Sequence, residues 1–306
     1  MPPSKSKVQR IREKIFTVRR IEYAPAMQQE ISDRFNSLTS RAETMQGLGE
    51  GALIIASEAK PDVDVEAGLS ALEELADRAR PLVEYAEEGS ARVEALNHAL
   101  FELERFHGNQ EQYDDPRNSF LDDVLTRRTG LPITLSVLYV EVARRLGFEA
   151  YGIGFPGHFL AKIVGIPDTP GGEVIVDPFF GRVLGLEDCA DRLRAAAGED
   201  VSLDPQWLRP ATSAEIYVRM LNNLKLHYLR RGDGLAALGC FDRILLLAPE
   251  AAPEYRDRGL LLERLDCILP AIEDLTRYLE LSPRDENAAA IRARRNALAE
   301  RKPVLN

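Results

Sequence analysis

A histidine and an aspartate form the pair of residues in this sequence that is best suited to chemistry. His158 opens the segment HFLAKIV, and Asp177 closes the segment EVIVD. Both segments are rich in β-forming residues, so we expect neighbouring strands of a hairpin that allow the carboxylate to hydrogen-bond the imidazole. An aspartate so placed orients the ring as a general base, which activates a thiol or a hydroxyl for attack on a carbonyl. The pair therefore predicts an acyl-transfer site or its remnant.

The nucleophile that such a pair would serve is expected at the start of the helix predicted over residues 132–146, where the helix dipole lowers the pKa of a thiol. The window GLPITLS contains no cysteine. Pro132 occupies the first turn instead, where its missing N–H would be unpaired in any case. Thr134 and Ser136 carry the nearest hydroxyls, which are much harder to deprotonate than a thiol. Cys189 lies downstream, and its helical spacing indicates a core thiol.

The start of this helix also suits binding without reaction. Its first turn offers unpaired N–H groups and a partial positive charge, which attract a carboxylate or an amide oxygen beside His158. The residues expected to line such a binding site are Asn118, Arg128, Pro132, Ile133, Tyr139, Gly157 and Phe179. Each also has a structural interpretation as a cap, a turn or a core side chain. The other histidines show no metal-ligand spacing, and the sequence indicates no cofactor.

Hydrophobic periodicity divides the chain into four parts that must position the site. We expect a basic, poorly ordered arm over 1–24, a helical region over 25–108, a core over 109–206, and helical hairpins over 207–306. In the helical region, apolar stripes predict one helix along 65–79 and another along 90–107, which Ser90 caps and Gly108 ends. In the core, helices at 118–128 and 132–146 precede an antiparallel meander of strands at 149–155, 158–164 and 173–177.

The last hundred residues repeat with a period of 34, the length of a tetratricopeptide unit. The motif positions of two units are expected at Leu224, Tyr228, Ala237, Phe241 and Pro249, and at Tyr255, Gly259, Ala271, Tyr278 and Pro283. Lys225 and Arg258 depart from the motif, because a small residue and a leucine are usual there. A terminal helix is expected at 285–300. Such hairpins either extend the preceding core or form a groove for a peptide.

Composition excludes several classes of protein. The 306 residues are 45% hydrophobic and 29% charged, which excludes disorder throughout, and no apolar run is long enough to cross a membrane. Three widely spaced cysteines are typical of reduced thiols, so we expect a cytoplasmic protein. The net charge of −10 divides into +6 over residues 1–20 and −16 over the rest. Nucleic-acid binding is therefore conceivable only through residues 1–20, and it is not favoured.

The order of these motifs resembles a known family. The segments that carry the likeness are NSFLDDVLTRRTGLPITLSVLYVEVARRLG, GFPGHFL, VDPFFGR and RDRGLLLERLDCILPAIEDL. They follow one another as in the bacterial SirB-type family, transglutaminase-like proteins with C-terminal tetratricopeptide repeats. The resemblance implies an α+β fold with a helical N-terminal region, a transglutaminase-like (papain-like) core of a helix and an antiparallel sheet, and C-terminal repeat hairpins. It also implies that His158 and Asp177 stand where a Cys-His-Asp triad has its histidine and aspartate, and that the protein is associated with regulation.

Two functions are compatible with these residues. The first is a non-catalytic or weakly catalytic protein that binds a polypeptide partner and acts in regulation, which Pro132 at the expected nucleophile position favours. The alternative is a hydrolase or acyltransferase that acts on amide bonds. In that enzyme Thr134, Ser136 or a water attacks the carbonyl, with His158 as the general base and Asp177 as its orienting partner.

Overall fold

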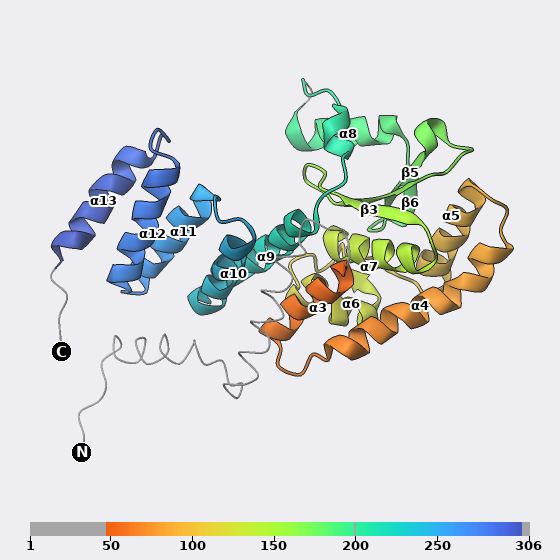
Figure 1. The fold of residues 1–306 in the computed structure, drawn as a ribbon, viewed down its shortest axis with the longest axis horizontal. Helices are drawn as coiled ribbons and strands as arrows, with labels where there is room; N and C mark the ends of the chain where they lie inside the picture. The colour runs from red at the N-terminus through yellow and green to blue at the C-terminus, as the bar shows by residue number, and fades with distance from the viewer. Residues whose placement is uncertain (1–46, 199, 302–306) are drawn as a thin grey trace, which may run out of the picture. The chain divides into compact units, whose positions relative to one another are not determined.

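The computed structural model describes residues 47–198 and 200–301, which fall into two compact units. The first unit covers the described residues up to Met220, and the second begins at Leu221 (Figure 1). The boundary falls within helix α9 (Ser213–Arg230). The basic arm predicted over 1–24 lies outside the described residues. Within those residues, no helix combines the length and the apolar character that a membrane crossing requires.

The first unit opens with α3 (Leu48–Ala59), α4 (Val65–Tyr85) and α5 (Ser90–Asn97). Asp64 caps α4 by accepting the N–H groups of Glu66 and Ala67. The helix predicted over 90–107 is shorter than expected, because α5 passes into a π-helix, η1 (His98–Leu103), and the chain then forms the short strand β1 (His107–Gly108). The prediction of Ser90 as the cap is wrong: Gly89 holds that position, and the Ser90 hydroxyl donates to Asp168 over 2.6 Å.

A second set of elements leads to the central helix α7 (Pro132–Arg145). These elements are η2 (Pro116–Ser119), α6 (Leu121–Arg127) and β2 (Thr129–Gly130). Strand β2 pairs with β1 in parallel, so Gly130 is fixed immediately before α7 begins. The predicted start of α7 at Pro132 is confirmed. Nearly every residue of α7 is buried, which makes it the central helix of the unit.

The sheet of the first unit is an antiparallel meander, as the sequence predicts. Its order is β3 (Glu149–Ile153), β4 (Leu160–Val164), β5 (Glu173–Asp177) and β6 (Arg182–Leu184). A short helix, η3 (Pro170–Gly172), precedes β5. One face packs on α8 (Leu186–Ala197) through a cluster that includes Leu160, Cys189 and Leu193 and extends to η4 (Pro205–Leu208). Helix α7 lies against the sheet through β3 and β4, and Figure 1 shows α7 and α8 on opposite sides of the strands.

The second unit consists of helical hairpins. After α9 come α10 (Gly234–Leu247), α11 (Ala252–Arg264), α12 (Ile268–Leu281) and α13 (Ala288–Glu300). Motif residues pack as the repeat predicts: Ala237 and Phe241 meet Leu261, while Ala271 and Tyr278 lie in the next cluster.

Lys225 and Arg258, the two residues that depart from the repeat motif, both form ion pairs. Lys225 Nζ lies 2.6 Å from a carboxylate oxygen of Glu254. Arg258 binds both carboxylate oxygens of Asp274 at 2.7 Å. The polar side chains are accommodated because each contacts a partner of opposite charge.

Candidate functional site

The structure brings His158 and Asp177 together. The Nε2 atom of His158 lies 3.0 Å from Oδ1 of Asp177, the last residue of β5. The sequence predicts His158 at the start of a strand, but β4 begins only at Leu160, so His158 lies before the strand. It lies in a tight turn that its own N–H closes by donating to the Phe155 carbonyl over 3.1 Å. Gly157 has a φ of 68° in this turn, a conformation that favours glycine.

Asp177 is fully buried and its charge is compensated. Its Oδ1 also accepts the N–H of Phe179 at 3.0 Å and the N–H of Phe180 at 3.3 Å. Its Oδ2 lies 2.5 Å from a guanidinium nitrogen of Arg192, which reaches over from α8. Sequence reasoning missed Arg192, because nothing in the local pattern of α8 indicates which strand residue it meets. The site is thus a histidine held by a buried carboxylate that already has a cationic partner.

Aromatic rings surround the imidazole. Phe179 meets it edge-on at 5.9 Å between ring centres, and Phe180 stacks on it at 6.1 Å. Tyr113 in turn contacts Phe179 edge-on at 6.1 Å. Phe180 and Tyr113 are 47% and 50% exposed, so they form an aromatic surface that solvent reaches. Because Asp177 engages Nε2, Nδ1 is the ring nitrogen left to meet a ligand.

Arg219 supports the turn that carries His158. Its guanidinium donates to the carbonyls of Phe155 at 3.1 Å and of His158 at 2.5 Å. No carboxylate in the described part of the chain pairs with it, and burial lowers its pKa. Burial also raises the pKa of Tyr113, which lies within electrostatic range of Arg219. Arg219 therefore places a positive charge beside the turn that carries His158.

The two hydroxyls predicted as substitute nucleophiles hold the start of α7. Thr134 Oγ1 donates to the Asn118 carbonyl at 2.6 Å and accepts the Leu131 N–H at 3.0 Å. Ser136 Oγ donates to the Phe159 carbonyl at 3.3 Å. Both residues are fully buried. These bonds join the helix start to the chain that follows His158, with Pro132 at the first helical position.

The other predicted binding residues are engaged in the framework of the unit. Asn118 is fully buried and donates to the Gln112 carbonyl at 2.8 Å, which braces the loop before α6. Arg128 adopts a left-handed conformation at the end of α6 and pairs with Glu104 at 2.9 Å. Tyr139 is buried on α7, where its hydroxyl donates to Asn97 at 2.7 Å. Ile133 is 2% exposed beside them.

Cys189 is a buried thiol in the core between the sheet and α8. Burial raises its pKa to about 11. At pH 8 only about one thiol in a thousand is then ionised, and the thiolate is the reactive form. We expect alkylation of Cys189 by iodoacetamide at pH 8 to be at least about a hundredfold slower in the native protein than in urea, as followed by mass spectrometry. Equal rates in the two conditions would contradict this assignment.

The Phe179 ring packs directly against Gly108. The Gly108 N–H donates to the Phe179 carbonyl at 2.9 Å, and a side chain at position 108 would overlap the phenyl ring. We therefore expect Gly108→Ala to lower the free energy of unfolding by about 2 kcal/mol, because either the strand or the ring must shift. The single tryptophan, Trp207, lies in the first unit and reports its unfolding in urea by fluorescence. Gly154→Ala is the matched control, since an added Cβ there would make only an ordinary van der Waals contact with Arg219, at 3.9 Å. Equal effects of the two substitutions would contradict the prediction.

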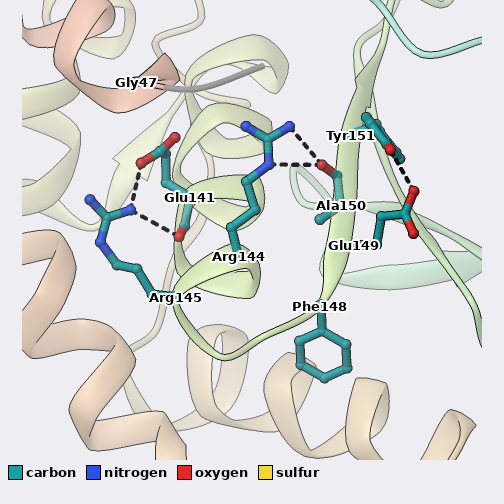
Figure 2. A pocket seen from close by; sticks show the side chains of 8 residues that line it. All are labelled: Gly47, Glu141, Arg144, Arg145, Phe148, Glu149, Ala150 and Tyr151. Atoms are coloured by element: carbon teal, nitrogen blue, oxygen red, sulfur yellow. Dashed lines mark hydrogen bonds and ion pairs between the residues drawn. The ribbon is translucent and has the colours of Figure 1, made fainter. Parts of the chain in front are cut away.

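A separate cavity of about 470 Å³ lies at the opposite end of α7 (Figure 2). Its charged groups bond to one another or to the main chain. Arg144 donates to the Ala150 carbonyl at 2.9 and 2.7 Å, Arg145 pairs with Glu141, and the Tyr151 hydroxyl donates to Glu149. None of the predicted site residues lines this cavity. Within residues 47–198 and 200–301, no group of three or more histidine, cysteine or acidic side chains is arranged to hold a metal ion.

Comparison with known proteins agrees with this architecture. The model of the transglutaminase-like superfamily matches residues 66–222, and a tetratricopeptide-repeat model matches residues 224–296. No solved structure matches the chain significantly.

Relatives of similar length share both parts. A UPF0162 protein of Xylella fastidiosa (strain 9a5c) is 37% identical over 262 residues, which cover 84% of this chain and 92% of the relative. A UPF0162 protein of Vibrio cholerae is 32% identical over 82% of this chain and 92% of its own length. The protein SirB1 of Salmonella typhimurium is 26% identical over 75% of this chain and 87% of its own. The chain therefore belongs to the transglutaminase-like superfamily and, within it, to the SirB-type family of UPF0162 proteins.

Proposed function

We propose that this protein binds a segment of a partner polypeptide at the turn that holds His158, and that it acts in regulation as a non-catalytic or weakly catalytic member of its superfamily. One observation carries the proposal: the His158–Asp177 pair is kept, while Pro132 occupies the first position of α7. Covalent acyl transfer requires a nucleophile within hydrogen-bonding reach of the base. A proline supplies none, so the geometry of the His158–Asp177 pair is better suited to holding a ligand.

The surroundings of His158 support a polypeptide as the ligand. Tyr113 and Phe180 are half-exposed aromatic side chains, and Arg219 is a cation without a carboxylate partner among the described residues. Tyrosine, phenylalanine and arginine are enriched at protein interfaces, because they combine large apolar contact area with directed polar groups. The tetratricopeptide repeats of the second unit point the same way, since such repeats form surfaces for other proteins.

The alternative function, hydrolysis or acyl transfer at amide bonds, is favoured by one observation. Asp177 holds Nε2 of His158, which leaves Nδ1 to accept a proton from a water or a hydroxyl. The proposal and this alternative differ in whether His158 supports turnover.

A paired experiment separates the two functions. Purified wild type and His158→Ala are assayed for release of p-nitroaniline from blocked peptide anilides and for amine incorporation into a glutamine peptide. Both proteins are also used to capture polypeptides from an extract of the native cell, with Arg80→Ala on α4 as the control. We expect no turnover that depends on His158, and a polypeptide that wild type and Arg80→Ala retain but His158→Ala releases. Turnover that disappears in His158→Ala would contradict the proposal and establish the alternative.

A further inference from the structure

Strand β6 is an edge of the sheet. It pairs with β5 through Arg182, Val183 and Leu184, and no other strand of the described chain lies on its outer side (Figure 1). An unpaired edge presents main-chain N–H and C=O groups that an extended polypeptide can satisfy by adding as a further strand. The edge begins one turn after Phe180, which stacks on His158. It therefore continues the surface to which the proposed function assigns polypeptide binding.

Large apolar side chains follow this edge. Phe180, Val183 and Leu186 are 47%, 48% and 61% exposed, and we call these three residues the apolar strip. Gly181 has a φ of 63° and is packed against Phe101, so the turn that presents Phe180 is held firmly. Soluble proteins usually protect edge strands by keeping them short or by charged side chains, and the short strand β6 has Arg182 as its single charge. Three exposed apolar residues beside a free edge instead favour contact with another chain.

The positive charge of Arg182 beside this edge indicates which kind of polypeptide segment can bind there. Arg182 is exposed, is in register with Asp177, and lies over the Phe180 ring with its guanidinium carbon 5.5 Å from the ring centre. Asp177 does not neutralise Arg182, because its carboxylate already pairs with His158 and Arg192. No carboxylate of the described residues forms an ion pair with Arg182. Arg219, which donates to the His158 carbonyl, forms no ion pair with a carboxylate of the described residues either.

We propose that an extended, acidic segment of a partner protein adds to the edge of β6, with apolar side chains on the apolar strip and a carboxylate on Arg182. Strand addition would satisfy the free main-chain N–H and C=O groups of this edge. An arginine binds a carboxylate through charge-assisted hydrogen bonds. Arg182 and Arg219, which form no ion pair with a carboxylate of the described residues, lie at separate places, which fits acidic side chains within a segment better than a single terminal carboxylate. This inference rests on the proposed function and specifies its ligand.

A positional-scanning library of fluorescent nonapeptides tests the proposal on the full chain. The peptides are acetylated and amidated at their ends, so that only side chains supply charge. We expect wild type to bind peptides with Asp or Glu at one position more tightly than peptides with a neutral residue there. In Arg182→Gln this ratio of affinities should fall about tenfold. Arg182→Glu should prefer Lys or Arg at the same position. Arg80→Gln is the control and should behave as wild type, because Arg80 is a half-buried arginine of α4 that pairs with Asp77 on the same helix. Thermal unfolding checks that each variant is folded.

The outcomes distinguish the inference from the proposed function. If peptides bind without a preference for acidic residues, or if that preference survives in both Arg182 variants, the inference of an acidic segment on Arg182 is wrong. Polypeptide binding itself would still hold. If no peptide binds wild type at all, the proposed function and this inference both fail. Amide hydrogen exchange at residues 182–184 is the second readout. Slower exchange with the selected peptide supports strand addition, and unchanged exchange overturns it.

Discussion

Replacing Asp177 by alanine is expected to lower the free energy of unfolding of the first unit by about 3 to 5 kcal/mol. The substitution removes the one carboxylate among the described residues that forms an ion pair with Arg192, whose side chain is 18% exposed, and leaves the guanidinium without that partner. It also removes the acceptor of the Phe179 and Phe180 N–H groups. The measurement is a urea titration followed by the fluorescence of Trp207, which lies in the same unit.

Two further variants show that the loss comes from an unpaired charge. Asp191→Ala removes an exposed aspartate from the same helix as Arg192, where its ion pair with Arg194 is at the surface, and should change stability by less than about 0.5 kcal/mol. Adding Arg192→Met to Asp177→Ala should recover much of the lost stability, because no charge is then left unpaired. A cost below about 1 kcal/mol for Asp177→Ala alone would contradict the role assigned to the pair.

Restoring the consensus residue of the repeat at position 258 is expected to destabilise the second unit. Arg258→Leu supplies the leucine that a tetratricopeptide motif prefers, yet it leaves Asp274, which is 6% exposed, without its cation. The pKa of Arg258 is raised despite its partial burial, because its bonds to Asp274 and Asp242 favour the charged form. We expect a loss of about 3 kcal/mol in the free energy of unfolding. Chemical denaturation followed by circular dichroism measures it.

A second substitution, at Asp274, tests whether the broken ion pair causes this loss of stability. The double variant Arg258→Leu/Asp274→Ala should regain most of the stability, because neither charge remains. Arg277→Leu is the matched control: Arg277 lies on α12, and its pairs with Glu250 and Glu280 are at the surface. Equal stability of wild type and Arg258→Leu would show that the ion pair contributes nothing beyond the leucine it replaces.

The parts of the fold that were predicted correctly are those whose signals are local. Pro132 marks the start of α7 because a proline is well tolerated only in the first turn of a helix. The meander follows from β-forming segments separated by turn residues, and the repeat hairpins follow from their 34-residue period. His158 and Asp177 were paired correctly because each borders one of two strands that are adjacent in the sequence.

The parts that were missed depend on partners far along the chain. Ser90 was predicted as a helix cap, but its hydroxyl bonds to Asp168, 78 residues away. Arg192 meets Asp177 because α8 packs on the sheet, and no periodicity in α8 signals that contact. Strand β6 has only three residues, which is too short for an alternating pattern to indicate a strand. Local propensity cannot specify such contacts, since they arise from the packing of elements.

The hydrogen bond from Gly108 to the Phe179 carbonyl has a consequence for how the site is assembled. It joins segments that are about seventy residues apart, and the parallel pair β1–β2 adds a third segment to the same junction. Closing loops of this length costs chain entropy before any contact is gained, so long-range junctions slow folding. The aromatic surface around His158 is therefore complete only when the helices, the sheet and their connection have all come together. A ligand that binds this surface reports the fully folded unit, and a fragment that lacks any of the three segments is expected to lack the site.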